Sequence, residues 1–272
     1  MYVSYWQLQE KPFEHWCDPR FYYPAESHQA ALLKLRYAIE NRRGGAVLAG
    51  PSGSGKTLLA AMLETALGPE FAPVVHVRFP QMSAEHLLAY LAGRLSDSEP
   101  APEAAAVHRS VEVIERSLAA NAERGGHAVV ILDEAHLLED RRVLEALRLL
   151  LNYGIGGRPA LTLLLVGQAG ILPILDRVPQ LQERMALRCL VRPLSDAETG
   201  RYVDHRLRLA GATRPLFQPQ ALAMLYRLTH GIPRQINRLA DLALLIGYAE
   251  QGEVVTAEQL EAIHDELVTA AA

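Results

Sequence analysis

Short, wholly apolar runs alternate along the first two thirds of the chain with longer segments whose apolar positions recur at helical spacing. Apolar runs without polar alternation are typical of parallel strands that are buried on both faces. Strands are expected at 46–49, 74–79, 128–132, 161–166 and 188–192, with helices at 27–42, 58–67, 83–95, 107–124 and 137–151. This alternation predicts an α/β fold with a doubly wound, parallel, five-stranded sheet.

After Pro193 the strand pattern stops, and the pattern predicts four helices in a small all-α domain. Their starts carry typical signals: Ser195 with Glu198 as a capping box, Gln218-Pro219, Gly231-Ile232-Pro233, and Thr256 with Gln259. The sequence therefore divides into an α/β domain over 1–193 and a helical domain over 194–272.

Residues 50–57, Gly-Pro-Ser-Gly-Ser-Gly-Lys-Thr, match the phosphate-binding pattern GxxxxGK[ST] between a strand and a helix. Gly50, Gly53 and Gly55 allow a tight loop whose N–H groups point at a β-phosphate, and the following helix adds its positive N-terminus. Lys56 would bridge the β- and γ-phosphates of ATP, and the Thr57 hydroxyl would bind Mg²⁺. The nucleotide contacts expected from this segment comprise Gly50, Pro51, Ser52, Gly53, Ser54, Gly55, Lys56, Thr57 and Leu58. The alternative is a flexible Gly/Ser linker, which the flanking strand and helix disfavour.

Polar residues follow two of the expected strands at the edge where ligands bind in open α/β sheets. Asp133 and Glu134 end the third strand. Asp133 would hold Mg²⁺ or its water, and Glu134 would deprotonate the water that attacks the γ-phosphate. Gln168 follows the fourth strand and could sense the γ-phosphate, since an amide both donates and accepts hydrogen bonds. Gln168 could equally be a surface loop residue.

Three arginines are candidates for contacts with the γ-phosphate. Arg184 or Arg188, which flank the fifth strand, could act as a finger from a neighbouring subunit, or pair with a carboxylate of its own chain. Arg234 begins a helix of the second domain and could link nucleotide state to domain angle. His136 and His28 are more typical of packed or solvated imidazoles than of catalysts.

Residues 1–23 contain eight of the chain's 17 aromatic residues without a clear period. They predict an extended strap, included in the first domain, whose rings cover a sheet edge. Stacking of Phe21 or Tyr22 on adenine is the alternative.

The amino-acid composition limits which partners and which cellular compartment are expected for this protein. Half of the residues are apolar, and 27 basic against 31 acidic residues give a net charge of −4, so no global positive field points to nucleic acid. Cys17 and Cys189 form no metal-ligand pattern. The N-terminus lacks signal-peptide features, and the longest apolar stretches are far shorter than a membrane helix. A soluble, cytoplasmic protein without membrane insertion is expected.

With these motifs the chain resembles an AAA+ ATPase, and within that class it is similar to the ExeA/GspA group associated with type II secretion. The resemblance implies Walker A at 50–57, Walker B at Asp133 and Glu134, sensor 1 at Gln168, an arginine finger at Arg184 and sensor 2 at Arg234. It also implies a sensor strand between the Walker strands, a helical lid, and ATP bound between subunits of a ring or filament. The matching stretches are 12–13, 18–23, 27–32, 50–57, 132–138, 165–168, 181–188, 193–195 and 231–239.

Members of this group usually continue into a transmembrane segment and a peptidoglycan-binding domain, whereas this chain ends near Ala272. It is accordingly expected to be a fragment of a longer protein or a standalone ATPase.

The leading hypothesis is an oligomeric, Mg²⁺-dependent ATPase that assembles or remodels an unidentified protein partner. The second is a DNA-associated regulator similar to TniB/TnsC transposition ATPases. A third hypothesis is a nucleotide-gated scaffold that binds ATP and barely hydrolyses it. This hypothesis is less favoured, because a scaffold needs no catalytic base such as Glu134. The arginines that could line DNA are Arg36, Arg42, Arg43, Arg141, Arg142, Arg206, Arg208 and Arg238.

Overall fold

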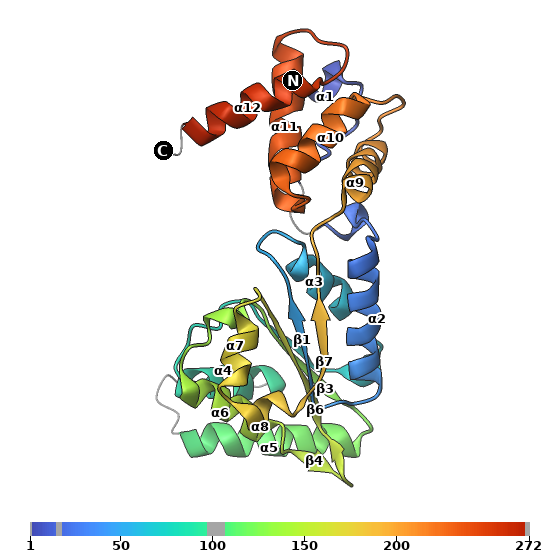
Figure 1. The fold of residues 1–272 in the computed structure, drawn as a ribbon. Coiled ribbons are helices and arrows are strands. Elements are labelled where there is room, and N and C mark those ends of the chain that lie inside the picture. Colours follow the sequence, from blue (N-terminus) through green and yellow to red (C-terminus); the bar gives the residue numbers. More distant parts are fainter. Residues whose placement is uncertain (1, 15–17, 97–106, 270–272) are drawn as a thin grey trace. The chain divides into compact units, whose positions relative to one another are not determined.

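The computed structural model describes residues 2–14, 18–96 and 107–269. It divides into two compact units, shown in Figure 1. The helical unit comprises Met1–Glu26, Pro51–Leu58 and Arg192–Ala272, and the sheet unit comprises Ser27–Gly50 and Leu59–Val191. The division predicted from sequence, at 193/194, differs from these units in where residues 1–26 and 51–58 belong.

The sheet unit is built on five strands in the order β2-β3-β6-β1-β7, with every neighbouring pair parallel. This confirms the predicted fold class, and β6 lies between β1 and β3 as the family resemblance implied. The strands are β1 (Gly45–Ala49), β2 (Val74–Val77), β3 (Ala128–Leu132), β6 (Leu161–Gly167) and β7 (Met185–Leu190).

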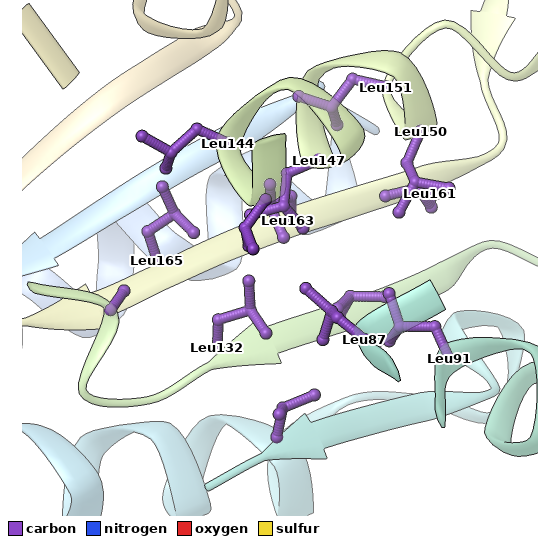
Figure 2. Packing of buried hydrophobic residues seen from close by; sticks show 14 of the residues in the cluster. Leu87, Leu91, Leu132, Leu144, Leu147, Leu150, Leu151, Leu161, Leu163 and Leu165 are labelled. Atoms are coloured by element: carbon purple, nitrogen blue, oxygen red, sulfur yellow. The ribbon is translucent and has the colours of Figure 1, made fainter. Parts of the chain in front are cut away.

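Helices cover both faces of this sheet, with α2 and α3 on one side and α4 to α8 on the other (Figure 1). Alternate residues of each central strand face opposite layers, which is why β1, β3 and β6 are buried throughout. Figure 2 shows leucines of β3, β6, α4 and α6 packed in the larger core. The helices are α2 (Glu26–Glu40), α3 (Lys56–Ala66), α4 (Ala84–Leu95), α5 (Val107–Glu123), α6 (Arg141–Leu150), α7 (Ile171–Asp176) and α8 (Pro179–Gln182).

The structure departs from the predicted elements at the start of α6 and in the segment after it. Asp140 accepts a hydrogen bond from the Arg142 N–H and starts α6 there, so the expected helix over 137–151 begins later. The hairpin of β4 (Gly154–Ile155) and β5 (Arg158–Pro159) forms where only a break was expected. Its two-residue turn consists of Gly156 and Gly157, both at positive φ.

The helical unit contains α1 (Tyr2–Tyr5), α9 (Asp196–Leu209), α10 (Pro219–Thr229), α11 (Pro233–Ala249) and α12 (Ala257–Thr269). The predicted capping box of Ser195 and Glu198 is present at the start of α9. Thr256 and Gln259 exchange reciprocal hydrogen bonds at the start of α12. Local sequence signals therefore placed these helix starts correctly.

The N-terminal aromatic residues are part of the helical unit's core. Tyr2, Trp6 and Phe13 are buried in the cluster formed by α9 to α12. The Trp6 indole N–H donates to the Leu244 carbonyl at 2.8 Å. The rings were expected to cover a sheet edge; instead their large apolar area is buried against helices of the C-terminal segment.

The ring of Phe21 is also buried in this unit, with the Arg206 guanidinium carbon 4.8 Å from its centroid. Arg206 donates hydrogen bonds to the Pro12 carbonyl and to the Tyr202 hydroxyl. A buried guanidinium is stabilised only when its donors are satisfied, so this contact fixes the segment on α9. The Phe21 ring is thus already engaged within the protein.

Candidate functional site

The glycine-rich loop between β1 and α3 has the conformation that its sequence predicts. Gly53 and Gly55 have φ of 75° and 91°, a region that side chains with a Cβ rarely adopt. The Lys56 ammonium donates to the Pro51 carbonyl at 2.8 Å, which spans the loop. Successive N–H groups in such a tight, partly left-handed loop form an anion-binding concavity.

Arg234 contacts this loop inside the helical unit. Its main-chain N–H donates to the Gly53 carbonyl at 3.2 Å, and its guanidinium lies 3.5 Å from the Ser52 hydroxyl oxygen. A Cβ on Gly53 would lie 2.7 Å from the Cβ of Arg234, so the close approach requires glycine there. The structure therefore brings together two groups of residues that are 182 positions apart in sequence.

The turn before α11 positions Arg234. Gly231 has a φ of 70°, and a Cβ there would lie 1.9 Å from the Leu194 carbonyl oxygen. The Leu194 N–H donates to the Gly231 carbonyl at 2.9 Å. Pro233 then begins the helix, where its missing N–H removes no helical hydrogen bond. This packing explains the Gly-Ile-Pro-Arg order from 231 to 234.

The acidic pair follows β3 at the carboxyl end of the sheet. Asp133 is buried, and its N–H donates to the Val77 carbonyl of β2 at 2.9 Å. Its carboxylate accepts the Glu134 N–H at 2.8 Å. Glu134 has left-handed φ and ψ of 52° and 32°, and its side chain is 45% exposed. Such a backbone conformation in a non-glycine residue is strained and is typical of functional sites.

His136 lies between Glu134 and Gln168, a relationship that the sequence analysis missed. Its Nδ1 is 3.4 Å from a Glu134 carboxylate oxygen and accepts the Gln168 main-chain N–H at 3.3 Å. Its Nε2 is 3.0 Å from the side-chain nitrogen of Gln168. Gln168 is therefore part of this group and not an isolated loop residue. Within the sheet unit, the three residues form a continuous polar group next to Asp133.

A second imidazole approaches Asp133 from β2. His76 Nδ1 lies 3.3 Å from a Glu64 carboxylate oxygen on α3, and its Nε2 lies 4.0 Å from an Asp133 oxygen. The His76 side chain is buried between these two acids. Only the three-dimensional neighbourhood of β2, β3 and α3 could have revealed this contact. His28, the other histidine considered from sequence, is buried in α2.

Arg188 lies on β7, the edge strand next to β1, and Arg184 immediately precedes that strand. Met185 pairs with Gly45 at the start of β1, and Leu190 pairs with Ala49 at its end. Arg184 therefore lies at the amino edge, six residues before the end of β7, or about 20 Å along the strand from the carboxyl edge. Both arginines are exposed, and Arg184 donates to the Leu151 carbonyl at 3.2 Å. Arg188 lies within β7, closer to the carboxyl edge.

A doubly wound sheet, a glycine-rich phosphate loop after β1 and acids after β3 together define a P-loop nucleotide-binding protein. The chain matches the AAA domain family over residues 39–175, about half of its length, and it belongs to that family of ATPases.

The curated relatives include general secretion pathway protein A of Aeromonas hydrophila, which is 34% identical over 252 residues. The match covers 92% of this chain but 45% of that protein, so the chain spans less than half of the relative's length. The resemblance to the ExeA/GspA group is confirmed by this similarity.

Solved structures support the fold. The ORC2 protein of Aeropyrum pernix, in ADPNP and ADP complexes, has a TM-score of 0.64 at 15% identity, covering 88% of this chain and 66% of that one. Drosophila ORC bound to DNA has a TM-score of 0.66 at 17% identity, and the match covers 89% of this chain and 60% of that one. The RuvB branch migration motor of Thermotoga maritima has a TM-score of 0.56 at 18% identity, and the match covers 89% of this chain and 67% of that one.

Among the residues that the structure describes, no helix combines the length and apolarity needed to span a membrane.

Proposed function

We propose that this chain is a Mg²⁺-dependent ATPase that works as an oligomer and assembles or remodels a protein partner. The observation that carries the proposal is the phosphate loop, in which Gly53 and Gly55 adopt positive φ and Lys56 spans the loop. Such a loop presents consecutive N–H donors to a polyphosphate. In this proposal Lys56 exchanges its bond to the Pro51 carbonyl for the β- and γ-phosphates of ATP.

The available side chains fit the metal that the family implies. Mg²⁺ prefers oxygen ligands and keeps several waters, so one or two protein groups suffice. In this proposal the Thr57 hydroxyl and the Asp133 carboxylate would supply such ligands. The main-chain N–H of Glu134 donates to the Asp133 carboxylate and orients it. When bound, the ion would neutralise negative charge on the phosphates.

In this proposal Glu134 is the general base. Its exposed carboxylate can orient and deprotonate a water for attack on the γ-phosphate. Gln168 supplies an amide that can contact the same phosphate. Arg184 lies at the opposite edge of its own sheet, which supports a role as a finger in a neighbouring subunit. Arg234 would join loop and lid around the bound nucleotide.

The partner is proposed from the secretion-pathway relative. A homo-oligomeric ring or filament in the cytoplasm would use ATP binding and hydrolysis to act on an unidentified protein complex. Because the match covers 45% of that relative, the relative's whole activity need not reside in these residues.

The DNA-associated alternative is not favoured. At 17% and 18% identity, the structural likeness to ORC bound to DNA and to the RuvB Holliday junction branch migration motor concerns the fold alone. Two of the arginines considered for a DNA track are engaged elsewhere: Arg206 is buried against aromatic rings, and Arg36 bonds Glu40 at 2.5 Å.

Titration calorimetry with ATP and Mg²⁺ tests the proposal on wild type and Lys56→Ala. We expect binding by wild type and at least about a tenfold loss in the variant, because a charge-assisted phosphate contact is removed. Absence of binding by wild type would refute the proposal. Size measurement with a nonhydrolysable analogue tests assembly. Salt-sensitive stimulation of hydrolysis by duplex DNA would instead favour the DNA alternative.

A further inference from the structure

The imidazole of His136 contacts both Gln168 and Glu134, so a change in its hydrogen bond to one residue can change its hydrogen bond to the other. Its Nδ1 faces the Glu134 carboxylate at 3.4 Å and the Gln168 main-chain N–H at 3.3 Å. Its Nε2 faces the Gln168 side-chain amide at 3.0 Å. A Cβ on Gly167 would lie 3.2 Å from Nδ1, so the ring rests closely over that glycine. The ring is held in place while its partners can change.

A neutral imidazole carries one N–H, and its other nitrogen accepts. Nδ1 can donate to the Glu134 carboxylate or accept from the Gln168 main chain, but it cannot do both. Nε2 then takes the complementary role toward the Gln168 amide. Each tautomer therefore permits one of two hydrogen-bond arrangements around the same ring.

We propose that His136 is a positioning residue that couples the orientation of the Gln168 amide to the availability of Glu134. This inference rests on the proposed function, in which Glu134 is the base and Gln168 faces the γ-phosphate. In the held arrangement, Nδ1–H donates to Glu134, and Nε2 accepts an N–H from the Gln168 side chain. In the released arrangement, Nδ1 accepts the Gln168 main-chain N–H, and Nε2–H donates to the Gln168 side-chain oxygen.

The orientation of the Gln168 amide selects one of these arrangements, because one end is an NH₂ donor and the other is an oxygen acceptor. When its NH₂ group donates to a phosphate oxygen, its oxygen turns toward Nε2 and requires a proton there. One proton leaves Nδ1 for water and another reaches Nε2 from water, so the net charge is unchanged. Glu134 then faces a lone pair and loses its donor. The base is thereby freed only when a γ-phosphate occupies the sensor amide.

A kinetic cycle with His136→Ala, Gln168→Ala and the double variant tests this coupling. We expect each single variant to lower kcat by about tenfold or more, and His136→Ala, which removes no phosphate contact, to keep ATP affinity within about twofold of wild type. The double variant should fall no further than the slower single variant, because both act through one relay. His108→Ala, on the exposed surface of α5, is the control and should leave kcat unchanged. Multiplicative losses, or a His136→Ala kcat within twofold of wild type, would overturn the proposal.

Nitrogen-15 spectra of the histidine rings test the relay in the wild-type protein without turnover. The His136 signals, assigned by their loss in His136→Gln, should show Nδ1–H with ADP and Nε2–H with a nonhydrolysable ATP analogue. The same tautomer with both nucleotides would overturn the relay while leaving the ATPase proposal intact. Wild-type protein that binds no ATP would instead overturn both proposals.

Discussion

The main-chain N–H of Arg234 donates to the carbonyl oxygen of Gly53 at 3.2 Å. This bond joins the first residues of α11 directly to the phosphate loop, without an intervening side chain. We therefore expect a change in loop conformation on nucleotide binding to shift the start of α11. The contact depends on Gly53, whose φ of 75° and missing Cβ allow Arg234 to approach.

We expect Gly53→Ala to weaken ATP binding by about tenfold or more. The substitution adds about 1–3 kcal/mol of backbone strain at positive φ, and its Cβ would meet the Cβ of Arg234 at 2.7 Å. Calorimetric titration with ATP measures the change. Gly170→Ala is the matched control, because a Cβ there meets nothing within 4 Å. Equal affinities in the two variants would contradict the account of this loop.

The position of Arg184 predicts catalysis between subunits. Because it lies at the amino edge of β7, it cannot serve the carboxyl edge of its own sheet. We expect Arg184→Ala to lower kcat by about 10³-fold or more, as for other arginine fingers. Mixing it with Glu134→Gln should restore activity, because the second variant supplies Arg184 to intact sites.

Arg188→Ala is the comparison that identifies the finger. If Arg184 is the finger, Arg188→Ala keeps its activity and needs no complementation. Loss of activity in Arg188→Ala with rescue by the same partner would assign the finger to Arg188. Failure of every mixture to recover activity would argue against a finger supplied by a neighbouring subunit.

A buried histidine at the amino edge of the sheet, His127 just before β3, predicts a pH dependence of stability. Thr162 donates its hydroxyl proton to the Arg43 carbonyl at 2.8 Å, so its oxygen accepts from His127 Nε2–H at 2.8 Å. Burial lowers the pKa of His127 from 6.5 to about 4, helped by the nearby charge of Arg42. The unfolded chain therefore binds a proton between these values that the folded protein does not.

The free energy of unfolding should accordingly decrease as pH falls from about 6.5 to about 4, by up to about 3 kcal/mol from this group. His127→Gln retains a side-chain N–H for Thr162 and cannot titrate. Urea unfolding of both proteins across this range measures the difference. Parallel curves for wild type and variant would show that His127 does not contribute.

The sequence predicted the elements whose signals are local. Apolar runs identified the strands, and Ser195 and Thr256 marked helix starts because caps act over three residues. The glycine pattern at 50–57 predicted a loop because only glycine readily takes the φ of Gly53 and Gly55.

The relationships that sequence did not predict are those between distant segments. His136 meets Gln168 only because β6 pairs with β3, which brings together positions 32 residues apart. The aromatic N-terminal residues lack a period that would indicate which core buries them, and Trp6 meets Leu244 across most of the chain. Apolarity predicts burial but does not specify the surface against which a ring packs.

Comparison of ATP affinity with ATP turnover in Glu134→Gln tests most directly whether Glu134 is the catalytic base. The substitution keeps the size of the side chain and removes its ability to accept a proton from water. We expect Glu134→Gln to bind Mg²⁺-ATP within about twofold of the wild-type affinity and to have a kcat at least about 100-fold lower. Turnover at the wild-type rate by this variant would contradict the assignment of Glu134 as the catalytic base.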